Sequence, residues 1–135
     1  MDLIRVLVID GDIDTTDMLK MVLDPDEFEV IATDSSKEGI ELINQKNPDI
    51  IILDQIMPMM RSREVCKAVR KINQVPILVL SVVNKPDTIA RSLDAGADDY
   101  LVKPFTNGVL VAHLHKLIRR SRTEISINEV NNHSL

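Results

Sequence analysis

Four side chains suited to phosphoryl chemistry each follow a short apolar run in this chain. They are two carboxylates, a hydroxyl and an ammonium, on Asp10, Asp54, Ser81 and Lys103. Carboxylates are ligands for Mg²⁺, and an aspartate can also attack phosphorus as a nucleophile. A lysine ammonium is a compact charge for a phosphoryl oxygen, and a serine hydroxyl can donate a hydrogen bond to another. If the four runs are neighbouring parallel strands, all four groups open at the same edge of one sheet.

The two aspartates would repel each other at such an edge. Carboxylates ~4–6 Å apart raise each other's pKa, and two charges ~4 Å apart interact by roughly 4 kcal/mol at an effective dielectric constant of ~20. A hard cation offsets this repulsion. Taken alone, an aspartate at a strand end is usually a turn or cap residue, a serine there is usually structural, and a lysine before proline indicates little. Their repeated position after apolar runs favours a shared cation and phosphoryl site.

Short apolar runs rich in β-branched residues alternate with amphipathic stretches along the chain. Such runs are typical of strands that are buried on both faces of a sheet. The predicted strands are IRVLVI at 4–9, FEVIA at 28–32, IIIL at 50–53, ILVL at 77–80 and YLV at 100–102. Ser35 and Glu38 have the spacing of a capping box at a helix start. One predicted helix follows Ser35 and carries Ile40, Leu42 and Ile43, and the others cover the stretches from about 14 to 23, 64 to 72, 87 to 95 and 107 to 120.

Five strands and five helices in strict alternation predict an α/β fold. This pattern requires a doubly wound parallel sheet with helices on both faces, joined by right-handed crossovers. We expect the strand order 2-1-3-4-5, in which the topological switch point lies between strands 1 and 3. Ligands bind there, outside the carboxyl ends of the strands. Asp10 ends the first run and Asp54 the third, so the fold and the chemistry indicate the same crevice.

Composition restricts the class of protein. The chain has 44% hydrophobic and 27% charged residues and a formal net charge of −5, which is typical of a globular domain without the basic face that nucleic-acid binding requires. Cys66 is the single cysteine, so no internal disulfide can form. No apolar stretch approaches the ~18 residues of a membrane span, and no signal peptide is evident. We therefore expect a cytoplasmic protein with no direct contact to nucleic acid or membrane.

Domain organisation is expected to be simple. Residues 1–120 contain the whole alternating pattern and form one domain. Residues 121–135, SRTEISINEVNNHSL, are polar and lack periodicity, which is typical of a tail, a frayed end or the stub of a linker.

Several segments carry a resemblance to a known family. They are VLVID at 6–10, PDIIILDQIMP at 48–58, EVCKAVR at 64–70, VPILVLS at 75–81 and AGADDYLVKPF at 95–105. From Ile4 to Arg120 the chain resembles the receiver domain of a two-component response regulator, which has the CheY-like, flavodoxin-like fold. The last of these segments is the most specific.

The resemblance implies roles for individual residues. Asp54 would be the phosphoacceptor, and Asp10 would belong to the acidic pocket that binds Mg²⁺. The main-chain carbonyl of Ile56 would be a further metal ligand. Lys103 would contact the phosphoryl group. Ser81 and Tyr100 would form the switch pair, and the Lys103–Pro104 peptide bond would be cis.

The resemblance also implies a function. The chain would be a phosphoprotein and signalling switch that takes a phosphoryl group on Asp54 from a sensor histidine kinase or a phosphotransfer protein, with Mg²⁺. Its own catalysis would be limited to accepting the phosphoryl group and slowly hydrolysing it, unlike that of a conventional turnover enzyme.

The acidic pocket departs from the family pattern. The family usually places two adjacent acids after strand 1, but here the second position is Gly11 and an acid follows only at Asp12. Asp12 either turns beside Asp10, because residues two apart in an extended segment point the same way, or caps the first helix. We expect weakened Mg²⁺ binding. The alternative is a pseudo-receiver, a protein-interaction module that has lost the metal.

A second surface has two interpretations. Charges of both signs fall on helix 4, strand 5 and helix 5: Arg91, Asp94, Asp98, Asp99, Arg119 and Arg120. In one subfamily of response regulators such charges build a symmetric homodimer. His113 stands where that subfamily often has arginine, so the alternative is an ordinary solvated surface.

Overall fold

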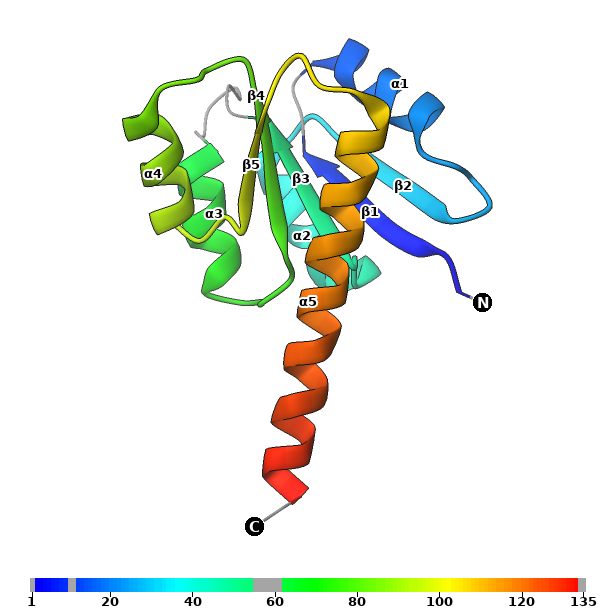
Figure 1. Ribbon diagram of the computed structural model, residues 1–135, viewed down its shortest axis with the longest axis vertical. Coiled ribbons are helices and arrows are strands. Elements are labelled where there is room, and N and C mark those ends of the chain that lie inside the picture. The colour runs from blue at the N-terminus through cyan, green and yellow to red at the C-terminus, as the bar shows by residue number, and fades with distance from the viewer. Residues whose placement is uncertain (1, 10–11, 55–61, 134–135) are drawn as a thin grey trace.

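Five parallel strands form the centre of the molecule, as the computed structural model shows (Figure 1). The structure describes residues 2–9, 12–54 and 62–133; side chains are described as far as residue 124, except that of Asp54. The strands are β1 (Ile4–Ile9), β2 (Phe28–Thr33), β3 (Ile50–Asp54), β4 (Ile77–Ser81) and β5 (Asp99–Val102). Their order is β2-β1-β3-β4-β5 and every neighbouring pair is parallel. The predicted fold class and strand order are confirmed.

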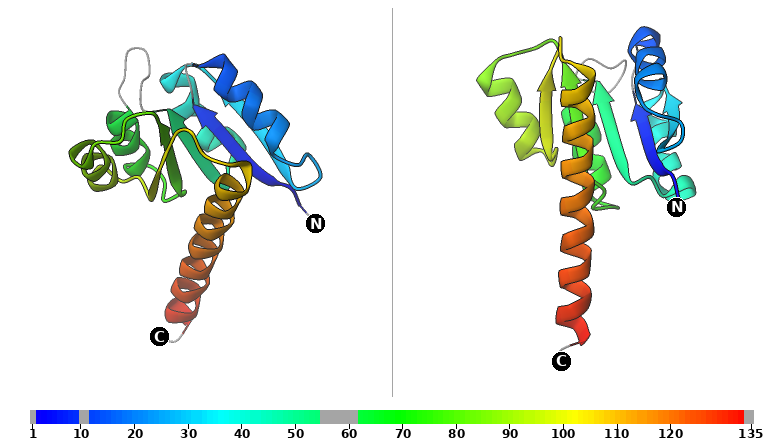
Figure 2. Two further views of the ribbon diagram at one scale, coloured as in Figure 1. Left: turned by 45° about the horizontal axis from the view of Figure 1, so that its top comes forward. Right: turned by 45° about the vertical axis from the view of Figure 1, so that its right-hand side comes forward.

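Helices cover both faces of this sheet (Figure 2). They are α1 (Ile13–Val22), α2 (Ser36–Lys46), α3 (Ser62–Arg70), α4 (Pro86–Asp94) and α5 (Asn107–His133). Side chains of α2 and α3 pack in one core layer, and side chains of α1 and α5 pack in the other. This arrangement satisfies the apolar faces of all three central strands.

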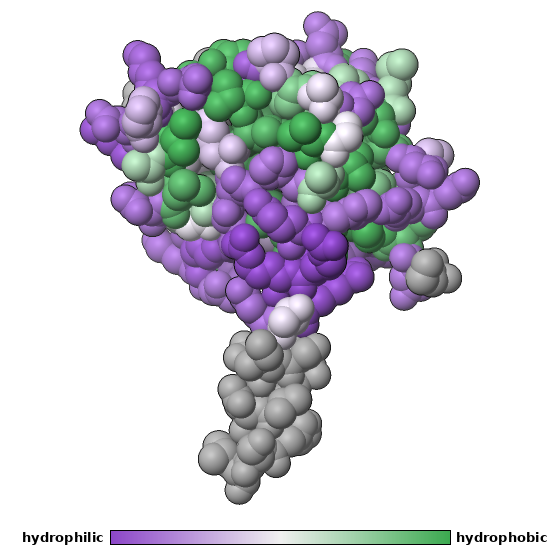
Figure 3. All heavy atoms as spheres, in the orientation of Figure 1, coloured by the Kyte–Doolittle hydropathy of each residue, from purple (hydrophilic) through white to green (hydrophobic). Residues whose placement is uncertain are grey.

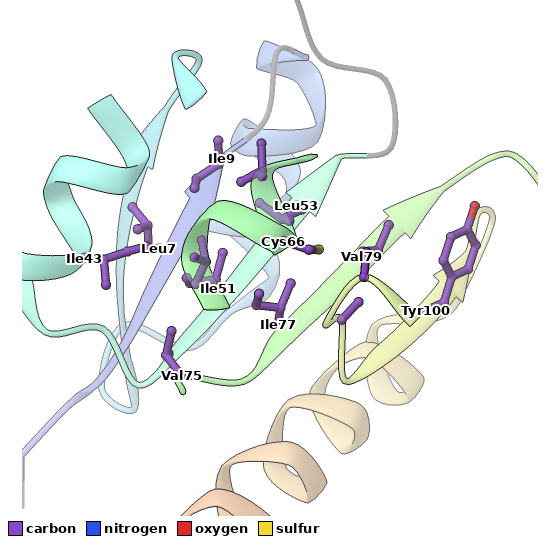
Figure 4. Packing of buried hydrophobic residues seen from close by; sticks show 14 residues of the cluster. Leu7, Ile9, Ile43, Ile51, Leu53, Cys66, Val75, Ile77, Val79 and Tyr100 are labelled. Carbon is purple, nitrogen blue, oxygen red and sulfur yellow. The ribbon is translucent and has the colours of Figure 1, made fainter. Parts of the chain in front are cut away.

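Alternate residues of each central strand enter opposite core layers, as the two-residue period of a strand requires. The layer under α2 and α3, drawn in Figure 4, takes Leu7, Ile9, Ile51, Leu53, Ile77 and Val79. The layer under α1 and α5 takes Val6, Val8, Ile50, Ile52, Leu78 and Leu80. All of these side chains are buried, which explains why the strands appear in the sequence as unbroken apolar runs.

Local signals place α2. The predicted cap at Ser35 is confirmed, because its hydroxyl accepts a hydrogen bond from the Glu38 N–H at 3.2 Å. Gly39 of α2 lies so close to β1 that a Cβ there would be 2.5 Å from Ile9 Cδ1. A glycine at this point therefore lets α2 pack directly above the last residue of β1.

The last helix differs from the expectation. α5 was predicted to end at Arg120, but it continues to His133 and extends well beyond the end of the sheet (Figure 1). Residues 121–133 contain no glycine or proline, so nothing in them stops a helix that has already begun. Figure 3 shows hydrophilic side chains gathered on the body where α5 leaves it. No helix among the described residues is long and apolar enough to cross a membrane.

Candidate functional site

The carboxyl ends of β3, β4 and β5 bring the predicted site residues to one edge. Asp54 ends β3 and pairs in register with Leu80, the residue before Ser81. Ser81 ends β4 and pairs with Val102, the residue before Lys103. The Lys103 N–H also donates to the Ser81 carbonyl at 2.7 Å. The backbones of Asp54, Ser81 and Lys103 thus follow one another across neighbouring strands.

Some of the predicted site lies outside the described residues. Asp10, Gly11 and Ile56 are among these, as is the side chain of Asp54. On the described part of β1, Ile9 pairs with Leu53. The residues immediately before Asp10 and Asp54 are therefore direct neighbours in the sheet, at the switch point of the strand order.

Asp12 is the N-cap of α1. Its carboxylate accepts hydrogen bonds from the Asp14 N–H at 3.0 Å and from the Thr15 hydroxyl at 3.1 Å. These two bonds lower the pKa of the Asp12 carboxyl, and the nearby Lys103 charge acts in the same direction. Of the two roles left open by the sequence, the structure shows the capping role.

Lys103 reaches from the end of β5 to the first turn of α1. Its ammonium donates to Thr15 Oγ1 at 3.2 Å, across 88 positions of sequence. In Figure 1 the segment after β5 arches over the carboxyl edge of the sheet toward α1. The Lys103–Pro104 peptide bond is cis, which agrees with the expectation.

Ser81 and Tyr100 are connected through the backbone of one residue, Val83. Ser81 Oγ accepts from the Val83 N–H at 3.0 Å, and Tyr100 Oη donates to the Val83 carbonyl at 2.8 Å. Ser81 is 1% exposed and Tyr100 is 9% exposed. The tyrosine ring is therefore packed inward, next to Val79 in Figure 4. Two hydrogen bonds thus attach these hydroxyls to the loop after β4.

The described residues do not form a metal site by themselves. No group of three or more His, Cys, Asp or Glu side chains that could hold a metal occurs among them. Asp12 has the charge and oxygen ligands that Mg²⁺ requires, but both of its oxygens accept hydrogen bonds at the start of α1.

The charged residues around β5 have partners within the chain. Asp98 accepts hydrogen bonds from Arg70 at 2.7 Å and from the Ile77 N–H at 2.8 Å. Asp99 contacts Lys116 at 2.9 Å and His113 at 2.7 Å. Burial raises the pKa of Asp99, but hydrogen bonds from Lys116, the Tyr100 N–H and His113 outweigh burial and hold this pKa below its usual value. These contacts take up part of the charge that one of the two interpretations of this surface places against a second copy.

Sequence reasoning missed two participants at this edge. Thr15 stands three residues after the cap Asp12, a spacing that could have suggested a side-chain contact at the helix start. Its contact with Lys103 had no such signal, because the two residues are far apart in the chain. Val83 takes part through its main chain, and no residue type is needed for that.

Known proteins resemble this chain in sequence and in fold. The family model described as the response regulator receiver domain matches residues 6–115. The cell cycle transcriptional regulator CtrA of Caulobacter vibrioides is 37% identical over 120 residues, covering 87% of this chain and 52% of that protein. The DNA-binding response regulator MtrA of Mycolicibacterium smegmatis is 32% identical over 130 residues, covering 93% and 57%. The chain thus spans about half the length of these relatives.

Solved structures of response regulators and receiver domains are also similar to this chain. The crystal structure of a two-component response regulator from Clostridium difficile superposes with a TM-score of 0.82 at 30% identity, covering 87% of this chain and 97% of that one. A CheY-like receiver domain protein from Methanospirillum hungatei gives a TM-score of 0.84 at 23% identity, covering 91% and 99%. The second similarity concerns the fold alone.

Proposed function

The chain belongs to the response regulator receiver domain family, and on this basis we propose that it is a signalling switch with Asp54 as its phosphoacceptor. The phosphoryl donor would be a sensor histidine kinase or a phosphotransfer protein. The observation that carries this proposal is the connection of Ser81 and Tyr100 through Val83. One buried hydroxyl on the strand next to Asp54 is linked by two hydrogen bonds to a tyrosine at the sheet edge.

The chemical step would be an in-line displacement at phosphorus. The Asp54 carboxylate forms a new O–P bond while the bond from phosphorus to the donor's leaving atom breaks, and the leaving group takes up a proton from solvent. Mg²⁺, when bound, would neutralise charge on the phosphoryl oxygens. Asp10, Asp54 and the Ile56 carbonyl would hold it, and Asp12 is a further candidate. The ammonium of Lys103 would bind a phosphoryl oxygen.

The switch would follow from the new charge. A phosphorylated side chain carries about −1.5 to −2 charges and additional acceptor oxygens. The Ser81 hydroxyl would then donate to a phosphoryl oxygen and give up its bond with the Val83 N–H. Because Val83 also accepts from Tyr100, the loop after β4, α4 and the β5 edge would respond together. A homodimer through α4, β5 and α5 is one way to use this response.

A second candidate function is a pseudo-receiver that keeps the fold without the metal. It is favoured by Gly11 and by the use of both Asp12 oxygens in capping α1. In that case the α4–β5–α5 surface would bind its partner without phosphorylation.

One experiment separates the two functions. The protein is incubated with Mg²⁺ and a small phosphodonor such as acetyl phosphate, and its intact mass is measured. The switch predicts one added phosphoryl group, which is absent in Asp54→Asn. No added mass in the unmodified chain at any Mg²⁺ concentration would rule out the switch. In a Mg²⁺ titration, Gly11→Asp should bind the ion more tightly, and equal affinity would show that Gly11 does not weaken the site.

A further inference from the structure

A chain of three polar groups joins the start of α1 to the end of β5. The Lys103 ammonium donates to Thr15 Oγ1 at 3.2 Å, and the Thr15 hydroxyl donates to Asp12 Oδ2 at 3.1 Å. Thr15 is 7% exposed, so its hydroxyl is largely shielded from water. The same Asp12 carboxylate is held by the Asp14 N–H through its other oxygen.

The direction of these hydrogen bonds is determined by chemistry. An ammonium can only donate and an ionised carboxylate can only accept, whereas a hydroxyl does both. The Thr15 hydrogen therefore points to Asp12, and a lone pair of its oxygen faces Lys103. Both bonds involve a charged partner, which makes each of them stronger than a bond between neutral groups. Neighbouring bonds in such a chain also polarise one another.

This geometry matters because lysine is flexible. Its ammonium lies at the end of a four-carbon side chain with many rotamers, and Lys103 is only half-buried. The Asp12 cap and the first turn of α1 are fixed by backbone hydrogen bonds, including one from the Thr16 N–H to the Asp12 carbonyl. Thr15 therefore gives the ammonium a defined place relative to the sheet edge.

We propose that Thr15 is a positioning residue that holds the Lys103 ammonium ready for the incoming phosphoryl group. This inference rests on the proposed function and extends it to the first helix. Thr15 does not touch the phosphoryl group and acts only through Lys103. Before transfer the ammonium donates to the Thr15 hydroxyl, and during transfer it keeps this bond while a second of its three N–H groups donates to the phosphoryl oxygen.

The test compares variants at Thr15 and Thr16. Thr15→Val keeps the shape of the side chain and removes the hydroxyl, whereas Thr15→Ser keeps the hydroxyl. Thr16→Val is the matched control, because Thr16 is the next residue of α1, is buried to a similar degree, and its hydroxyl makes none of the contacts described above. The rate of phosphoryl acceptance from acetyl phosphate is measured by intact mass.

Thr15→Val should slow phosphoryl acceptance about tenfold, the order expected for losing one hydrogen bond to a charged group. Thr15→Ser should recover most of the rate, and Thr16→Val should change it by less than about twofold. In a Lys103→Met background, Thr15→Val should add almost no further loss, because residues that act as a unit are not additive. Equal losses from Thr15→Val in the presence and absence of Lys103 would overturn the proposal.

A second measurement requires no phosphorylation, and its decisive result comes from the unmodified protein, so it does not depend on whether a variant folds. The ¹⁵Nζ relaxation of Lys103 in the unmodified protein should report a restricted ammonium, and that restriction should persist in Thr15→Ser and be lost in Thr15→Val. A freely rotating Lys103 ammonium in the unmodified protein would refute the positioning role. If the protein accepts no phosphoryl group at all, the proposed function fails, and this measurement still decides whether Thr15 holds Lys103.

Discussion

Tyr100→Phe tests the link between Tyr100 and the loop after β4. The substitution keeps the buried ring and removes only the hydroxyl, which donates to the Val83 carbonyl at 2.8 Å. Because the ring remains packed, the loss is that of one hydrogen bond, about 1 kcal/mol of unfolding free energy. A typical urea dependence of about 2 kcal/mol per molar then gives a midpoint lower by about 0.5 M.

The assay is urea unfolding followed by far-UV circular dichroism, since Tyr100 is the single tyrosine and the chain has no tryptophan. Because the chain has one tyrosine and no tryptophan, tyrosine fluorescence of the unmodified protein reports on Tyr100 alone. We expect this fluorescence to change on phosphorylation. An unchanged urea midpoint in Tyr100→Phe would show that the bond to Val83 contributes nothing in solution.

The link predicts coupling with Ser81. Ser81→Ala removes the acceptor of the Val83 N–H, and by itself should also cost about 1 kcal/mol. Since both bonds hold the same residue, the double variant should differ from the sum of the single variants by at least ~0.5 kcal/mol. Strict additivity would refute the idea that Val83 connects the two hydroxyls.

Four other outcomes are expected. Gly96 has φ of +121°, and a Cβ there would be 2.6 Å from Arg70 Cγ. Gly96→Ala should therefore lower the unfolding free energy by ~1–3 kcal/mol in urea unfolding. Gly108 lies in a helix with no atom within 4 Å of a Cβ, so Gly108→Ala should instead raise the unfolding free energy by ~0.5–1 kcal/mol. The pKa of Asp99 is held below its ordinary value of 3.8. The ionised carboxylate therefore stabilises the fold above pH 3.8, and this stabilisation is lost as the pH falls through the lower pKa of the folded state. The urea midpoint of Asp99→Asn should fall less on acidification than that of the unmodified protein, and an identical acid profile would contradict this. Burial raises the pKa of the Cys66 thiol from 9.0 to about 11. About 2–3 kcal/mol of unfolding free energy should therefore be lost as the pH rises between these two values. Cys66→Ala should lack this alkaline loss, and the thiol of the unmodified protein should react with a maleimide at neutral pH only after unfolding.

Several features of the fold could be predicted because their signals are local. Unbroken apolar runs such as 50–53 and 77–80 indicate strands buried on both faces, and the alternation with helical spacing requires parallel connections. Ser35 and Glu38 marked the start of α2 in the same way. The end of α5 could not be predicted, because residues 121–133 are polar without being helix breakers, and a helix that has begun continues at little cost.

The site was only partly predictable. Ser81 and Lys103 were correctly expected at adjacent strand ends, since each directly follows an apolar run. Asp12 had two possible roles in the sequence, and the hydrogen bonds from the Asp14 N–H and the Thr15 hydroxyl identified it as the cap of α1. The roles of Asp10, Ile56 and the Asp54 carboxylate stay predictions that rest on the family.

The sequence by itself determined the alternation of strands and helices, the parallel sheet and the edge at which Asp54, Ser81 and Lys103 lie, because apolar periodicity and the handedness of crossovers are enough for that. The expected strand order was one of two common doubly wound arrangements, and the structure shows that order. Only the tertiary structure decided that Lys103 rests on Thr15 and that Tyr100 meets the loop after β4. Long side chains choose among partners that are remote in sequence, and that choice depends on which helix packs beside which strand.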